Sequence, residues 1–93
     1  MADNFLSSSV EIVNKKGLHA RAASCFVKCA EQFDVQIWVE KDGNRVSGNS
    51  IMGLMMLAAA KGSHITLLIS GKEADLAMDA LTKLIANRFG EEE

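Results

Sequence analysis

The chain has 93 residues, of which 48% are hydrophobic and 24% charged, which predicts one globular domain and excludes a disordered chain. The net charge of −2 argues against a broad nucleic-acid-binding surface. Two cysteines are too few to staple a small secreted fold, so we expect the reducing cytoplasm. Proline is absent, so helices must end at caps and at the seven glycines.

The two ends of the chain carry little pattern. Residues 1–7 lack a basic stretch followed by an apolar run, so we expect an N-terminal extension and no signal peptide. Residues 90–93 are interpreted as a frayed acidic tail. The longest apolar segment, 51–60, is shorter than the roughly 18 residues of a membrane span, so no membrane is expected as a partner.

The first third of the chain predicts a strand followed by a helix. Residues 10–14 alternate apolar and polar side chains, as a half-buried strand does. A Lys-Lys-Gly turn follows at 15–17. Between residues 20 and 32, apolar side chains recur at spacings of three and four, which predicts an amphipathic helix.

A β-hairpin is predicted next. Residues 35–40 place three β-branched apolar side chains on one face and Trp38 on the other. The Asp-Gly-Asn sequence at 42–44 predicts a tight turn, because glycine and asparagine tolerate a positive φ. Residues 45–47 should then pair back as a short strand.

The second half predicts a helix, a strand and a helix. Residues 51–60 form a short helix that Asn49 or Ser50 can cap and a glycine can end. Residues 64–70 are β-branched and apolar at alternate positions. Residues 74–89 carry one continuous apolar stripe and predict the last helix.

The element order is therefore βαββαβα. Alternating strands predict a sheet with one face in water, and three helices can cover the other face. We therefore predict an α+β fold, an open-faced β-sandwich, in a single domain that spans residues 1–93.

The segment after the first turn is the best candidate for chemistry. His19 stands at the expected N-cap, although histidine is not a favoured cap, so the first-turn N–H groups stay open. Such a helix end binds anions, and Arg21 adds a guanidinium that can contact phosphate oxygens. Residues 15–30 carry four basic side chains and no acid. His19 is therefore a candidate phosphate carrier; the alternative is a plain surface histidine in a turn.

The short helix at 51–60 begins with apolar residues on every side. If one side is buried, Ile51, Met52 and Met55 form an exposed, adaptable patch that docks partners; the alternative is that they are core residues. Ser50 also has two interpretations: a plain N-cap, or a phosphorylation switch at a helix N-terminus.

The remaining reactive side chains favour structural roles. Cys25 and Cys29 lie four apart on one helix, too far for an unstrained disulfide. No CxxC motif or histidine pair supplies further metal ligands, and His64 stands alone. We therefore predict no metal and no cofactor, which disfavours a metal-carrier domain.

Two segments together resemble a known family. The sequence GLHAR at 17–21, followed by NSIMGL at 49–54, is similar to HPr, the histidine-containing phosphocarrier of the bacterial phosphoenolpyruvate phosphotransferase system. The resemblance covers about residues 10–89 with the same element order. It implies four antiparallel strands covered on one face by three helices.

The resemblance also implies roles for single residues. His19 would accept and donate the phosphoryl group through Nδ1, and Arg21 would stabilise the phosphohistidine. Ser50 matches the family's regulatory serine, which HPr kinase/phosphorylase modifies where that enzyme exists. Four apolar residues would form the docking surface for partners: Leu18, Ile51, Met52 and Met55.

The implied function is that of a phosphoryl carrier, not an enzyme. A cytoplasmic monomer would take the phosphoryl group from enzyme I and pass it to an enzyme IIA-type acceptor in sugar uptake or regulation. The alternative is a nitrogen-type or purely regulatory HPr-like protein that acts through Ser50 and docking. Many members carry proline where this chain has Ala22, which leaves the branch open.

Overall fold

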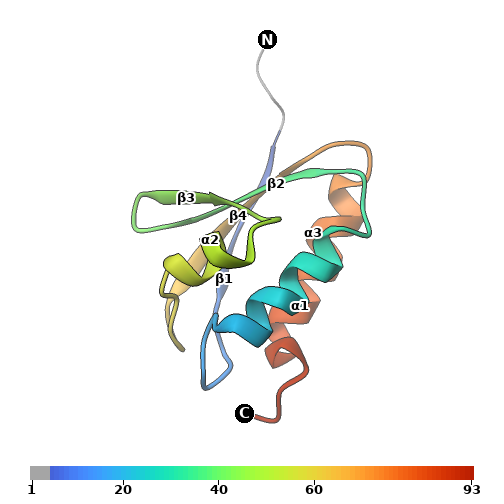
Figure 1. The fold of residues 1–93 in the computed structure, drawn as a ribbon. Coiled ribbons are helices and arrows are strands. Elements are labelled where there is room, and N and C mark those ends of the chain that lie inside the picture. The colour runs from blue at the N-terminus through green and yellow to red at the C-terminus, as the bar shows by residue number, and fades with distance from the viewer. Residues whose placement is uncertain (1–4) are drawn as a thin grey trace.

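The computed structural model describes residues 5–93 as an antiparallel four-stranded sheet with helices on one face (Figure 1). The strand order is β1-β4-β2-β3, and each neighbouring pair is antiparallel. The predicted α+β open-faced sandwich is confirmed. In chain order the elements are β1 (Leu6–Glu11), α1 (Ala20–Ala30), β2 (Gln36–Lys41), β3 (Asn44–Ser47), α2 (Ile51–Met56), β4 (His64–Ser70), α3 (Ala74–Ala86) and the short 3-10 helix η1 (Arg88–Gly90).

The central strands β4 and β2 carry the inner layer of the core. Their apolar residues alternate with half-buried ones, and Val39 lies opposite Leu67 in the register. This period of two turns one face of the sheet toward the helices. On the other face Trp38 lies opposite Leu68, and both are half-buried.

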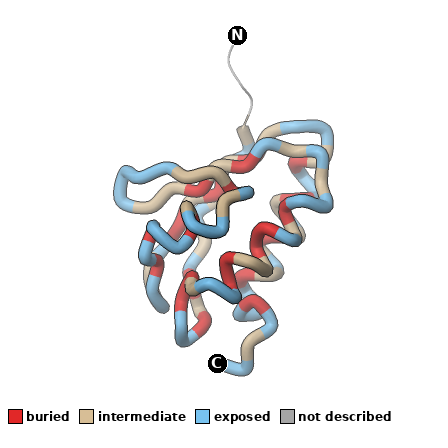
Figure 2. Tube along the Cα trace, in the orientation of Figure 1, coloured by how far each residue is buried: buried red, intermediate tan, exposed pale blue. Residues whose placement is uncertain are grey.

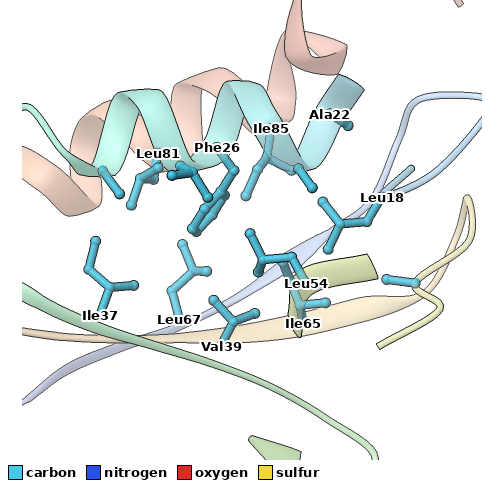
Figure 3. Packing of buried hydrophobic residues seen from close by; sticks show 14 of the residues in the cluster. Leu18, Ala22, Phe26, Ile37, Val39, Leu54, Ile65, Leu67, Leu81 and Ile85 are labelled. Atoms are coloured by element: carbon cyan, nitrogen blue, oxygen red, sulfur yellow. The ribbon is translucent and has the colours of Figure 1, made fainter. Parts of the chain in front are cut away.

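Helices α1 and α3 close the core from above. Phe26 of α1 is completely buried beside Leu81 and Ile85 of α3, and the three face the sheet (Figure 3). Figure 2 shows the buried residues along the sides of both helices that face the strands. Burying a large apolar side chain of this kind contributes about 1.5–3 kcal/mol, so these helices hold their places firmly.

The first strand lies earlier than predicted. β1 runs from Leu6 to Glu11. The strand predicted at 10–14 therefore begins four residues earlier, and the extension predicted at 1–7 includes its first two residues. Residues 1–4 of that extension lie outside the described part. The three serines at 7–9 give this segment no clear hydrophobic alternation, so the sequence pattern did not predict a strand there. The segment is a strand because its backbone pairs with β4. Residues 12–14 therefore leave the sheet and lead into the candidate site.

The two later helices end sooner than predicted, in each case at a backbone turn. After α2, Ala58 has φ 53°, a left-handed conformation that costs an L-residue about 1–2 kcal/mol. After α3, Arg88 and Phe89 have φ 58° and 55°, and this turn buries Phe89. The remaining elements lie within one or two residues of their predicted bounds.

Candidate functional site

The loop before α1 is fixed by glycine and by contacts across the molecule. Gly17 has φ 68°, and a Cβ at this position would collide with the carbonyl oxygen of Ala59. The next N–H, that of Leu18, donates to the same carbonyl at 2.9 Å. The Leu18 side chain is buried in the core. Backbone and side chain together therefore fix where the following residue begins the helix.

His19 is the N-cap of α1, as the sequence predicted. Its backbone is extended, with φ −83° and ψ −176°, and its side chain makes no capping hydrogen bond. Its carbonyl accepts from the N–H of Ala23 at 2.8 Å. The His19 side chain therefore leaves the first-turn N–H groups open, and these groups have no acceptor within the helix.

Basic and acidic segments face each other across a cleft of about 410 Å³. One side consists of Lys15, Lys16, His19 and Arg21, and the other of residues 90–93. Within residues 5–93, the Arg21 side chain forms no ion pair, and residue 21 is exposed. Its guanidinium is free to contact an anion at this end of α1.

The acidic tail is folded onto the site, which corrects the expectation of a frayed end. The Nε2 atom of His19 contacts Oε2 of Glu91, and Nδ2 of Asn14 donates to Oε1 of Glu91 at 3.0 Å. Lys15 holds Glu93 through an ion pair of 3.3 Å and through its backbone N–H. The left-handed turn at residues 88–89 directs this segment back toward the start of α1 (Figure 1).

These contacts settle the charge of Glu91. Burial alone would raise its pKa, but the hydrogen bonds from Asn14 and His19, with the charges of His19 and Lys16, outweigh burial and lower the pKa. Glu91 is therefore an ionised carboxylate near neutral pH. Sequence reasoning missed it, because its partners lie 72 and 77 residues away.

The expected apolar patch on α2 is exposed, with one correction. Ile51, Met52 and Met55 are 40%, 73% and 42% exposed, so they are not core residues. Met56 is 79% exposed and enlarges the patch, although the prediction omitted it; its place four residues after Met52 was the available signal. The prediction for Leu18 was wrong, since its side chain is only 4% exposed and packs inward.

Ser50 is the N-cap of α2, where its Oγ accepts from the N–H of Gly53 at 2.9 Å. The patch lies close to the histidine in the fold, because α2 packs against α1. A second hollow, of about 220 Å³, is lined by His19 and by the segment 58–60 that follows α2.

Other reactive groups stand apart from this site. Cys25 and Cys29 are free and half-buried, and burial raises the pKa of the Cys29 thiol, which makes it less reactive. Residues 5–93 hold no cluster of three side chains that could bind a metal ion. None of the helices in this part of the chain is long and apolar enough to cross a bilayer.

The fold and the site together define a class: a small open-faced sandwich that presents one histidine and a nearby guanidinium at an open helix N-terminus. Comparisons with known proteins agree. The family model described as "PTS HPr component phosphorylation site" matches residues 6–87. The chain belongs to the HPr family, the phosphocarrier proteins of the phosphotransferase system.

Relatives and structures cover nearly the whole chain. "Phosphocarrier protein HPr" of Neisseria meningitidis serogroup A is 56% identical over 88 residues, covering 95% of this chain and 99% of that protein. "Phosphocarrier protein NPr" of Shewanella violacea is 42% identical over 86 residues, covering 92% and 94%. The crystal structure of HPr-C-His from Thermoanaerobacter tengcongensis superposes with a TM-score of 0.90 at 45% identity, covering 95% and 99%.

Proposed function

We propose that this protein accepts a phosphoryl group from enzyme I on Nδ1 of His19 and passes it to an enzyme IIA-type acceptor. The observation that carries the proposal is the place of His19: it caps α1 without a side-chain hydrogen bond to the helix, in a cleft lined by three basic residues. The two unpaired cysteines of α1 are in keeping with a cytoplasmic protein.

The site supplies positioning and charge, which is what phosphoryl transfer needs. The first-turn N–H groups and the dipole of α1 favour a dianion by about 0.3–1 kcal/mol per charge at an exposed helix end. A charge-assisted hydrogen bond from Arg21 adds about 1.5–3 kcal/mol. These modest terms suit a carrier, because a phosphate held too tightly could not move to the second partner.

Docking is assigned to the patch on α2. Methionine side chains are flexible and polarisable, so one surface can fit the different shapes of a donor and an acceptor. Met52 and Met56 are the most exposed of its residues. Their closeness to the histidine would let one docking event present His19 to the active site of either partner.

The test is phosphorylation with enzyme I and phosphoenolpyruvate. The wild-type protein should gain one acid-labile phosphate by mass spectrometry, and His19→Ala should gain none. His64→Ala is the matched control, because His64 is exposed at the start of β4, and this variant should be phosphorylated like the wild type. Full labelling of His19→Ala would refute the proposal.

A second, regulatory function is proposed for Ser50. A phosphate on its Oγ would sit at the N-terminus of α2, next to the exposed patch, and would add negative charge to the docking surface. HPr kinase/phosphorylase with ATP should label the wild type and leave Ser50→Ala unlabelled. Equal labelling of both proteins would contradict the assignment.

The branch of the phosphotransferase system is a separate question. Relatives of this chain carry both the HPr and the NPr name, with the higher identity on the HPr side. We therefore place the chain in the sugar-type branch first and the nitrogen-type branch second. Transfer from the phosphorylated protein to a sugar-type enzyme IIA should be faster than to a nitrogen-type enzyme IIA, and the reverse order would favour the alternative.

A further inference from the structure

The two ring nitrogens of His19 have different surroundings. Nε2 contacts the carboxylate of Glu91, whereas Nδ1 makes no hydrogen bond with any side chain in residues 5–93. An ionised carboxylate can only accept a hydrogen bond, so the proton of this contact belongs to Nε2. In the neutral imidazole the other nitrogen then carries the free lone pair.

Glu91 is itself held in place. Asn14 is completely buried and uses both N–H bonds of its amide: one reaches the carbonyl of Gly17 at 2.8 Å and the other Oε1 of Glu91 at 3.0 Å. Both partners are acceptors, which fixes the orientation of the amide. Its Oδ1 is left buried with no hydrogen-bond partner in the described structure. A buried oxygen without a hydrogen-bond partner is unusual in folded proteins. Here it belongs to the same Asn14 amide whose nitrogen holds Glu91 against His19.

We propose that Glu91 is a positioning residue for phosphoryl transfer: it holds the proton on Nε2 of His19, which keeps Nδ1 free as the nucleophile. This inference rests on the function proposed above and adds a residue to it. Carboxylates that orient a histidine through its second nitrogen act in the same way in hydrolases and in metal sites.

The transfer step shows where the charge of Glu91 acts. The lone pair of Nδ1 forms the new P–N bond, while the P–N bond of the donor's phosphohistidine breaks and its electron pair stays on the donor's ring nitrogen. The proton on Nε2 remains there. The ring of His19 thereby becomes an imidazolium, and its positive charge is stabilised by the adjacent carboxylate.

The surroundings favour positioning over a mere electrostatic block. Lys15, Lys16 and Arg21 face the same cleft, so the cleft stays basic enough to attract a phosphoryl group despite Glu91. A blocking tail would have to occupy Nδ1 or the ion-pairing positions of Arg21. Glu91 instead contacts Nε2, and Arg21 has no acidic partner within residues 5–93.

The test compares two glutamates, one in the cleft and one far from it. Glu91→Ala and Glu91→Gln remove the acceptor or its charge. Glu31→Ala and Glu31→Gln are matched controls, because Glu31 is exposed at the far end of α1 and its side chain makes no ion pair with residues 5–93. The rate of phosphorylation by enzyme I and phosphoenolpyruvate should fall about tenfold or more in both Glu91 variants and stay within about twofold in the controls.

Nitrogen-15 NMR of the His19 ring gives a readout that needs no phosphoryl donor. The wild-type protein should hold the proton on Nε2, with a slowly exchanging Nε2–H signal. Glu91→Ala should lose that signal and gain the Nδ1–H tautomer, while Glu31→Ala should match the wild type.

The outcomes separate this inference from the proposed function. If the wild type accepts no phosphate, the carrier assignment fails, whatever the ring spectrum shows. If the wild type is phosphorylated normally, and the Glu91 variants are phosphorylated equally fast with an unchanged ring spectrum, only the positioning role fails. Faster phosphorylation of the Glu91 variants would also overturn the positioning role, because the tail would then shield His19.

Discussion

The loop around His19 and the patch on α2 lie side by side and are built in opposite ways. The loop is held by hydrogen bonds, by the buried Leu18 and by Asn14, which together fix the backbone at His19. The patch exposes flexible methionines, and α2 is anchored from below by the buried Leu54. The phosphoryl transfer proposed for His19 needs a fixed nitrogen, whereas the docking proposed for the patch needs a surface that adapts to different partners.

Removing the anchor beneath the patch should have the largest effect. Leu54 is completely buried in the core, so Leu54→Ala should lower the free energy of unfolding by about 3–5 kcal/mol. Urea unfolding followed by circular dichroism measures this. Met56→Ala is the control on the same helix and should change stability by less than about 0.5 kcal/mol. Equal losses of stability in the two variants would contradict the burial of Leu54 and the exposure of Met56.

A side chain at Gly17 should disturb the fixed loop almost as strongly. Gly17→Ala places a Cβ against the Ala59 carbonyl at a positive φ, so stability should fall by about 2–4 kcal/mol. Gly43→Ala is the matched control: its φ is 83°, but no atom lies within 4 Å of the added Cβ, so it should lose only about 1–2 kcal/mol. Similar losses would show that the contact with Ala59 does not fix the loop.

A polar residue in the patch should affect docking and leave the fold intact. With this protein as the substrate, Met52→Ser should raise the KM of enzyme I about tenfold and change kcat little. The Met52 side chain contributes binding energy before the transfer step. Leu76→Ser, at an exposed apolar position on α3, is the control and should leave KM unchanged. A fall in kcat with constant KM would place Met52 in the chemical step.

The smallest expected effect is the loss of the stability contributed by the Glu91 contacts as the pH falls. Because the pKa of Glu91 is lowered in the folded protein, its contacts stabilise the fold above the ordinary value of about 4.3 and lose that effect as pH falls through the lowered pKa. The stability difference between wild type and Glu91→Gln should therefore be present at pH 7 and shrink below about pH 4. The other titratable groups that line the cleft around this carboxylate are His19, Lys15, Lys16 and Arg21, with Glu92 and Glu93 of the tail. A difference that grows in acid would contradict the assignment.

Local patterns predicted most of the fold. Alternation predicted β2 and β4, and the apolar stripes predicted α1 and α3. The placing of His19 at a helix N-cap and the exposure of Met52 were also readable, because both follow from short-range spacing.

Long-range pairing and left-handed turns were not readable. The serine-rich β1 is a strand through its pairing with β4, and α2 ends where Ala58 takes a positive φ that alanine does not signal. The family resemblance implied that Leu18 belongs to the docking surface, and nothing in the local sequence indicated that its side chain is buried. The contact of Glu91 with His19 depends on the same kind of distant meeting.

The tail contact also bears on the order in which the protein is made and folded. Asn14 and Glu91 are 77 positions apart, and the ribosome delivers the first long before the second. The His19 loop and α1, which ends 61 positions before Glu91, can be outside the ribosome while the carboxylate is still unsynthesised. A nascent chain therefore presents the histidine without its second partner. The complete arrangement around the ring exists only after residue 91 has left the ribosome, so the positioning proposed for Glu91 is available only from then on.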